Sequence, residues 1–314
     1  MTQAELAEKA GVNQSVIGSL EAGPGTSSKY TANIAKALGV SVSNLLSEDT
    51  PIENPQIRFA DELYTMLDRF FQVFKVHKIP VAKIPCLLTN IRRSTMLHPE
   101  SLSDSLSPLV INKMCDFFRV EENWLLGFSE IIYKPKKWQS DIYALCRNII
   151  FYKNQGYKIE VIYCSNQKIN NKVFEHSKKY ESDESSLEIG IVLQLVKQQR
   201  GVKFKSYEVW ESIKWNHFKS RVRLKAVIMF CLKHKIEQCS RNLTQSDFNN
   251  IYEGKNLAYP FFEKIVPYSW YPDDFISTSD RNPDLDELKF VKEEYLERGL
   301  DELTKQFNNL DTGA

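Results

Sequence analysis

The pattern of apolar and polar positions predicts two short helices at the start of the chain. Thr2 and Glu5 have the spacing of a capping box, which satisfies unpaired N–H groups at a helix start. Gly11 then provides a flexible stop, and Asn13 is a residue type that caps a following helix, predicted over residues 14–22 before a Gly-Pro-Gly run. The positions predicted to face inward are Leu6, Ala7, Ala10, Val16, Ile17 and Leu20.

Two short helices joined by a tight, glycine-containing turn form the geometry in which the second helix enters the major groove of DNA. The residues at the N-terminal end of that helix then reach the base edges. Here they are Gln14 and Ser15, followed one turn later by Gly18 and Ser19. Glutamine can bond bidentately to adenine and serine to several base edges, so these positions are predicted to read the base sequence.

Two stretches of residues 2–46 carry a specific family resemblance. They are T-Q-A-E-L-A-E-K-A-G-V-N-Q-S-V-I-G-S-L-E-A-G and Y-T-A-N-I-A-K-A-L-G-V-S-V-S-N-L-L. This sequence resembles the Xre/Cro family of phage repressors and related bacterial regulators, in which I-A-K-A-L-G-V closes a small helical bundle. The resemblance implies a DNA-binding module over residues 1–49. It implies base readout by Gln14, Ser15, Gly18 and Ser19, and backbone contacts by Gln3, Asn13, Ser28 and Lys29.

Two features of this module depart from the family pattern. Family members normally have a further helix before the T-Q pair, so the apolar faces of Leu6, Ile17 and Ile34 are expected to be exposed unless another segment covers them. We therefore expect either a start upstream of Met1 or a later helix that takes this place. Residues 1–50 also hold three lysines against five acidic residues, which predicts weak attraction to phosphate. The alternative role for such a module is docking or dimerisation without DNA binding.

A second, weaker copy of the module follows a polar linker that contains two prolines. Residues 59–76 have the spacing of an amphipathic helix. Shifting the first module by 80 positions then aligns several apolar residues without a gap. The pairs are Ile34 with Met114, Ala35 with Cys115, Leu38 with Phe118, Val40 with Val120, and Leu45-Leu46 with Leu125-Leu126. Residues 56–133 are therefore predicted to form a diverged second helix-turn-helix bundle.

Prolines and positive charge distinguish this second copy. Four prolines interrupt the stretch in which scanning and recognition helices would lie, so base readout by this copy is not expected. They are Pro80, Pro85, Pro99 and Pro108. Residues 69–93 hold six basic residues and no acidic one, and Arg92 and Arg93 are predicted to contact the DNA backbone. The alternative for these cations is a solvated helix face and loop.

Beyond Lys134-Pro135-Lys136-Lys137, which has the composition of a hinge, the periodicity becomes that of an α+β domain. The predicted elements are a helix over 138–154, a strand over 158–164, a hairpin of 187–198 and 202–211, and a helix over 217–235. Residues 138–270 are thus expected to form a sensory or interaction domain. Its aromatic series is expected to belong to the core, with a ligand pocket as the alternative. The series comprises Tyr207, Trp210, Trp215 and Phe218.

Charge is strongly segregated in this half of the chain. Residues 197–235 hold eleven basic residues against two acidic ones, whereas residues 273–311 hold twelve acidic residues against five basic ones. The basic region can bind nucleic acid or the chain's own acidic tail. Residues 284–311 predict an acidic amphipathic helix, which we expect to dimerise rather than to lie across another surface. Its predicted apolar face comprises Leu296, Leu300, Leu303, Phe307 and Leu310.

The composition and the absence of known motifs argue against several classes of protein. The 314 residues are 42% hydrophobic and 26% charged, which is typical of a globular protein, and no apolar run approaches the ~20 residues of a membrane span. Without a secretory pattern at Met1, a cytoplasmic protein is expected. Six cysteines and five histidines lack metal-ligand spacing, and no phosphate-binding loop, dinucleotide fingerprint or G-x-S-x-G occurs. We therefore expect no metal, no cofactor and no enzymatic activity.

The sequence as a whole predicts a mainly α N-terminal half with two helix-turn-helix bundles, followed by an α+β domain and a terminal amphipathic helix. The leading functional hypothesis is a homodimeric repressor, of phage or mobile-element type, that binds a double-stranded DNA operator. Its C-terminal domain would respond to a small molecule or a protein. The alternative is an antitoxin or phage-defence component whose main role is protein binding and whose helix-turn-helix regulates its own operon.

Overall fold

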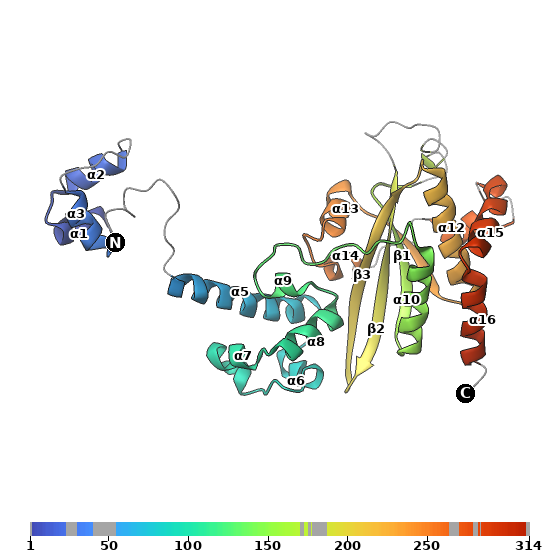
Figure 1. The fold of residues 1–314 in the computed structure, drawn as a ribbon, viewed down its shortest axis with the longest axis horizontal. Helices are drawn as coiled ribbons and strands as arrows, with labels where there is room; N and C mark the ends of the chain where they lie inside the picture. Colours follow the sequence, from blue (N-terminus) through green and yellow to red (C-terminus); the bar gives the residue numbers. More distant parts are fainter. Residues whose placement is uncertain are drawn as a thin grey trace. The chain divides into compact units, whose positions relative to one another are not determined.

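The computed structural model describes residues 2–22, 30–39, 55–169, 173, 174, 177, 187–263, 270–278, 282 and 284–311. The chain divides into two compact units, Met1–Asp61 and Glu62–Ala314, each of which has its own core (Figure 1). In the first unit the described helices are α1 (Gln3–Ala10), α2 (Gln14–Ala22) and α3 (Thr31–Leu38). The predicted bounds of the second helix are therefore confirmed.

The small core of the first unit forms where α1 packs against both α2 and α3. It consists of Ala7, Ala10, Ile17 and Ile34, with Leu6 half-buried beside them. Ile17 and Ile34 are only 3% and 6% exposed, so their apolar faces are covered. The described part of this core is shared by α1, α2 and α3.

A four-stranded mixed sheet forms the centre of the second unit (Figure 1). Its strands are β1 (Lys158–Ser165), β2 (Glu188–Gln199), β3 (Val202–Lys214) and β4 (Glu237–Asn242), in the order β3-β2-β1-β4. The predicted hairpin is β2–β3, and its turn has positive φ at both Arg200 and Gly201, as a two-residue hairpin of this twist requires. The short and polar β4, which pairs parallel to β1, was not predicted.

Both faces of this sheet are buried. Alternate residues of β1 point to opposite cores, with Val161 and Tyr163 in one and Ile162 and Cys164 in the other. The first face packs against α10 (Ile142–Asn154) and α12 (Phe218–Lys233). Helices α15 (Leu288–Glu297) and α16 (Leu300–Asp311) pack in turn on α12 and α10 and complete the same core. The second face packs against α13 (Gln245–Tyr252), α14 (Tyr259–Phe262) and the helical segment that precedes the sheet. None of the helices described is long and apolar enough to span a bilayer.

That helical segment runs from α5 to α9 (Figure 1). Its elements are α5 (Pro55–Val76), η1 (Val81–Lys83), α6 (Ile84–Leu87), η2 (Thr95–Leu97), α7 (Pro99–Ser105), α8 (Pro108–Phe118) and α9 (Glu122–Leu125). The prolines interrupt this stretch as predicted, because Pro85, Pro99 and Pro108 lie in the first turns of three separate helices, where a missing N–H costs nothing. Residues 88–98 separate α6 from α7, so the tight turn of a helix-turn-helix is replaced by a long connection.

The 80-residue offset coincides with matching backbone features in α3 and α8. Helix α3 ends at Leu38 and is followed by Gly39 in the left-handed region, with φ 73°. Helix α8 ends at Phe118, 80 positions later, and is followed by left-handed Arg119, with φ 58°. This agreement is consistent with a repeat, although the assignment of residues 56–133 to a second helix-turn-helix bundle stays a prediction.

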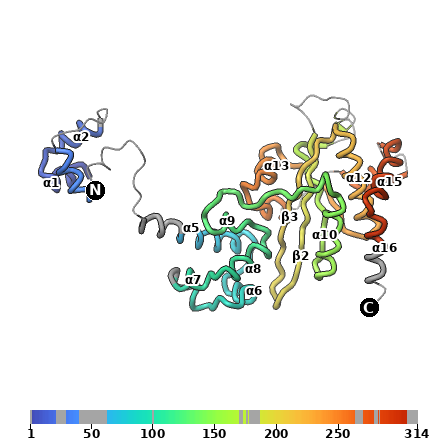
Figure 2. The backbone as a smooth tube through the Cα atoms, in the orientation of Figure 1, coloured from blue at the N-terminus to red at the C-terminus, as the bar shows by residue number. Residues whose placement is uncertain are grey.

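One continuous hydrophobic core joins the helical segment to the sheet. His77 lies within it, with its ring centroid 4.7 Å from that of Phe118 and 4.8 Å from that of Tyr259, and burial lowers the pKa of His77 to about 4. The hinge expected over residues 134–137 is wrong, because Lys136 forms a bridge with β3 and its ammonium lies 2.7 Å from the Glu208 carboxylate. The connection between α9 and α10 therefore runs along the sheet as a fixed strap (Figure 2).

The acidic tail packs onto the basic α12 of its own unit. The Lys225 ammonium, fully buried, lies 2.5 Å from oxygens of both Asp284 and Glu287, and the Arg221 guanidinium lies 2.5 Å from Glu287. Burial alone would raise the pKa of the Glu287 carboxyl, but the Arg221 hydrogen bonds and the Lys225 charge outweigh burial and hold it below its usual value. A second pair joins Arg223 to a glutamate of α15. The acidic tail and the basic α12 thus partly neutralise each other's charge inside the fold.

The terminal helix was predicted incorrectly in two respects. It is broken, because Gly299 has φ +68° and separates α15 from α16, and a short η5 (Leu285–Glu287) precedes them. Two residues of its predicted dimer face, Leu300 and Leu303, are buried against the sheet domain, whereas Leu296 is 60% exposed. Phe307 and Leu310 lie outside the side chains described. The tail thus covers its own core, and its central leucines are not available to a partner.

Replacing Lys225 by Met tests the buried charge network. The substitution keeps an unbranched chain of similar size but leaves Asp284 and Glu287 with one buried cation, which we expect to lower the free energy of unfolding by about 3–5 kcal/mol. Chemical denaturation of the full chain measures the change. Lys292→Met on the exposed side of α15 is the control and should have almost no effect. Equal stabilities of the two variants would contradict a structural role for the network.

Candidate nucleic-acid interface

Helix α1 is capped at both ends, and its C-terminal cap forms the turn to α2. Thr2 and Glu5 form the predicted capping box, with the Glu5 N–H 3.3 Å from the Thr2 hydroxyl and the Thr2 N–H 2.8 Å from the Glu5 carboxylate. At the other end, Gly11 has φ +67° and Val12 donates its N–H to the Ala7 carbonyl at 2.9 Å. These bonds reverse the chain between the two helices. They fix the direction in which α2 starts.

The N-terminal end of α2 is presented to solvent. Gln14, Ser15 and Ser19 are exposed and Gly18 is half-buried. A Cβ atom built on Gly18 would meet nothing within 4 Å, so no packing requirement of the described structure demands glycine there. Asn13 is also exposed, and its carbonyl accepts the N–H of Val16 at 2.9 Å, which closes the first turn. The structure thus places the predicted base-reading positions on one accessible end of a helix.

Two internal hydrogen bonds modify the predicted roles. The Ser19 hydroxyl donates to the Ser15 carbonyl at 2.7 Å, so only its oxygen lone pairs remain for an outside donor. The Gln3 side-chain amide donates to the Glu21 carboxylate at 2.5 Å, which leaves Gln3 one further N–H. Glu21 was not predicted as a site residue, because no local spacing relates positions that lie 18 residues apart.

The described helices of the first unit give little electrostatic attraction for DNA. Its described helices carry the exposed acids Glu5, Glu8 and Glu21 against Lys9 and Lys36, so they offer no net attraction to phosphate. Ser28 and Lys29, the predicted backbone contacts, lie outside the described residues. Affinity from this unit therefore has to come from hydrogen bonds and shape more than from charge.

A stretch of sequence with basic residues and no acidic residue, residues 69–93, lies in the second unit. The exposed cations are Lys75, Lys78, Lys83, Arg92 and Arg93. Arg69, which belongs to the same acid-free run, is a structural residue instead. Its guanidinium donates to the carbonyls of Trp124 and Ser129 and pairs with Glu130, so it anchors α5 to α9 and to the segment that follows α9. Five cations of the predicted six thus remain at the surface.

The aromatic series of the C-terminal half does not line a common pocket. Tyr207, Trp210 and Trp215 are buried, at 3%, 2% and 1% exposure, whereas Phe218 is 42% exposed. Tyr207 belongs to the core on one face of the sheet, and both tryptophans belong to the core on the other. The expectation that the series contributes to the core is confirmed for these three residues.

Reactive groups in the described part of the chain are buried and dispersed. Burial raises the pKa of the Cys164 and Cys231 thiols to about 12, which leaves them protonated and poorly nucleophilic. Within the residues described, His, Cys, Asp and Glu side chains form no cluster of three that could hold a metal ion.

A family model described as helix-turn-helix matches residues 1–45. These residues are a helix-turn-helix of the Xre/Cro type, and the C-terminal half matches no family model. Comparisons with curated proteins and with solved structures gave no significant match. The match therefore assigns only residues 1–45 of the chain.

Two glycines of this module provide a matched test of the geometry. Gly11→Ala forces a side chain into left-handed backbone and should destabilise the first unit by about 1–2 kcal/mol. Gly18→Ala replaces a helical glycine that has open space around it and should stabilise the unit by about 0.5–1 kcal/mol. Hydrogen exchange of α1 and α2 amides in the full chain measures both. Changes of the same sign at the two positions would show that the turn or the helix is placed incorrectly.

Proposed function

We propose that this chain, whose first 45 residues form an Xre/Cro-type helix-turn-helix, is a sequence-specific DNA-binding transcription regulator that acts as a homodimeric repressor. One observation carries the proposal. The N-terminal end of α2 is exposed and lined by uncharged hydrogen-bonding side chains, in a domain whose family match is to helix-turn-helix proteins. Such an end can enter the major groove.

Each residue of this end has a distinct proposed role. Gln14 forms a bidentate pair with adenine, and Ser15 bonds to a neighbouring base edge. Gly18 lets the helix approach the groove closely because it has no side chain. Ser19 accepts a bond from a base amino group, since its own proton is held by the Ser15 carbonyl. Gln3, oriented by Glu21, donates its remaining N–H to a phosphate, and the exposed Asn13 reaches the same strand.

Arg92 and Arg93 are proposed to supply the phosphate attraction that the first unit lacks. Both are exposed, and the loop that carries them is free of acidic residues. Helix α7, which follows the loop, bears the exposed acid Asp104, which opposes base readout by this segment. The second unit therefore contributes affinity and not sequence preference.

The α+β domain is proposed to receive the regulatory signal. A hollow of about 460 Å³ is bordered by Gln139, Glu211, Ser212 and Tyr252, side chains that can hydrogen-bond a small polar ligand. A protein effector on the same domain is the second form of this proposal.

A gel-shift assay on the chain's own upstream DNA tests sequence-specific binding. Gln14→Ala should reduce discrimination between the operator and scrambled DNA by about tenfold or more, because a bidentate base contact contributes about 1–3 kcal/mol. Asn33→Ala, which removes an exposed amide from α3, is the matched control and should leave discrimination unchanged.

Absence of sequence preference in a folded wild-type protein would refute the proposed function, as would an unchanged preference in Gln14→Ala. A stoichiometric protein co-purified through residues 138–314, together with operator binding confined to the chain's own promoter, would favour the antitoxin or phage-defence role.

Salt dependence tests the proposed phosphate contacts. Removing both cations in Arg92→Ala/Arg93→Ala should weaken binding to specific and scrambled DNA alike. It should also reduce the slope of log affinity against log salt by about 2. Lys134→Ala/Lys137→Ala removes two exposed cations from the strap and should leave the slope unchanged. An unaltered slope in the arginine variant would show that these residues are only solvated.

A further inference from the structure

Helix α5 has a surface stripe that the core of its own unit does not cover. Its buried side carries Leu67, Phe70, Val73 and Phe74. The opposite stripe has the alternating four- and three-residue spacing of a helix-pairing face. It comprises Tyr64, Asp68, Phe71 and Lys75, with Gln72 beside it. Tyr64 is 60% exposed and Phe71 is half-buried, so the stripe presents two aromatic side chains to solvent.

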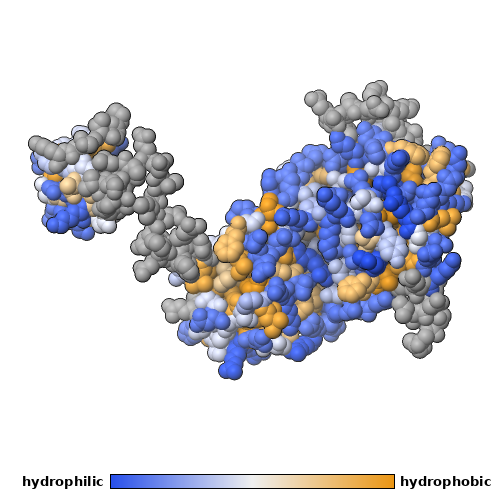
Figure 3. Space-filling view, viewed as in Figure 1, coloured by the Kyte–Doolittle hydropathy of each residue, from blue (hydrophilic) through white to orange (hydrophobic). Residues whose placement is uncertain are grey.

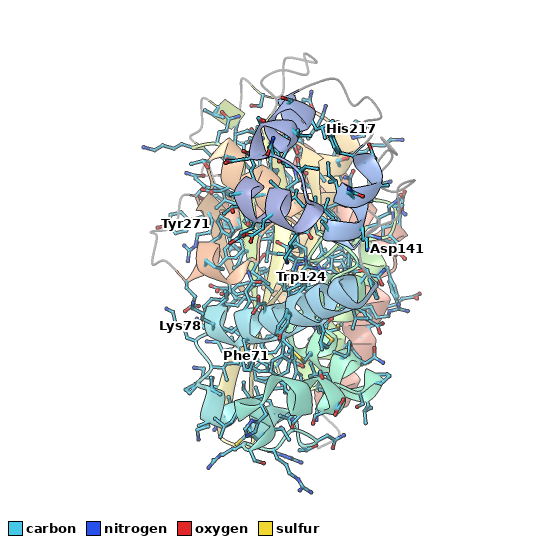
Figure 4. The ribbon with its side chains drawn as sticks, turned by 90° about the vertical axis from the view of Figure 1, so that its left-hand side faces the viewer. Phe71, Lys78, Trp124, Asp141, His217 and Tyr271 are labelled. Atoms are coloured by element: carbon cyan, nitrogen blue, oxygen red, sulfur yellow. The ribbon has the colours of Figure 1, made fainter. Side chains whose placement is uncertain are left out.

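A hollow accompanies this stripe and extends to the turn that follows the helix. It encloses about 630 Å³, and its lining is mainly apolar. The lining includes Phe71, Phe74, Lys75, Ile79, Pro80 and Val81, and Val81 is 53% exposed. Apolar side chains reach the surface over the part of the second unit that contains α5 (Figure 3), and Figure 4 labels Phe71 and Lys78 there. Aromatic side chains beside a hollow are typical of protein-interface anchors.

The charges on the stripe are arranged so that it is complementary to itself. Phe71 and Gln72 mark its centre, with Asp68 about one helical turn before this point and Lys75 about one turn after it. When two such helices cross antiparallel at that centre, Asp68 of one faces Lys75 of the other, twice. A parallel arrangement would oppose like charges instead. One face thus carries its own electrostatic complement, as a two-fold interface requires.

We propose that a second copy of this chain docks on the α5 stripe through an antiparallel, two-fold contact centred on Phe71 and Gln72. Tyr64 and Phe71 fill the partner's hollow, and the Asp68–Lys75 pairs select the antiparallel orientation. This assigns dimerisation to α5 and not to the acidic tail, whose Leu300 and Leu303 are buried. The contact itself is argued from α5 alone. Only the purpose of the dimer, which is to engage two DNA half-sites, rests on the proposed function.

Exchanging the charges of Asp68 and Lys75 tests the proposed two-fold contact in the absence of DNA. The mass of the full chain is measured by sedimentation equilibrium for the wild type, Asp68→Lys, Lys75→Asp and the double variant. Each single variant should raise the dimer dissociation constant at least about tenfold, because it places like charges opposite each other. The double variant restores opposite charges and should recover dimerisation. Lys292→Asp/Glu293→Lys makes the same exchange on the exposed side of α15 and should not alter the mass.

Recovery in the double variant supports the proposal, because a residue that mattered only for folding would not be rescued by a second charge change. Circular dichroism confirms that each variant is folded. A monomeric wild type, or a double variant no better than the single ones, would overturn the interface. Either result leaves the proposed DNA recognition standing if operator discrimination still depends on Gln14, so failure of the interface and failure of DNA recognition are distinguishable.

Discussion

The central constraint on the second unit is that its sheet is buried on both faces. Each strand alternates between two cores, so every strand residue near the middle of the sheet needs a covering helix. The helical segment α5–α9 helps to cover one face, and α10 and α12 cover the other beneath the tail helices α15 and α16. This requirement explains why residues 134–137 and the acidic tail, which the sequence suggested were a hinge and a free helix, are both packed against the second unit. The hinge of residues 134–137 is held on β3, and the tail is held on α12.

Burial also decides which charges remain available to partners. Lys225 and Arg221 stand in the densest basic stretch of the sequence, yet they are fixed inside the fold by Asp284 and Glu287. Arg69 is likewise unavailable to a partner, because its guanidinium donates hydrogen bonds to backbone carbonyls. A cation held by such bonds cannot bind phosphate without a large loss of stability. The surface cations that remain beside α5 are therefore the more informative part of the charge pattern.

Local features were predictable from the sequence, and long-range ones were not. The capping box at Thr2, the turn at Gly11 and the hairpin at Gly201 depend on neighbouring residues, and each was placed correctly. The polar strand β4 was missed because its pairing with β1 comes from the crossover and not from apolar alternation. The tail was misjudged because a helical face that suits a dimer equally suits the chain's own core, as Leu300 shows. Within the candidate site, Gln14 and Ser15 were located by motif, whereas the bond between Gln3 and Glu21 required coordinates.

We propose three separate tasks along one chain: base reading at the start of α2, phosphate attraction after α6, and pairing of two copies along α5. Each task lies on a surface that the cores leave exposed. Selection of binding sites from random DNA duplexes by the full-length protein tests the central claim most directly. We expect an enriched motif made of two related half-sites in inverted orientation. Recovery of no enriched motif from a folded protein would contradict it.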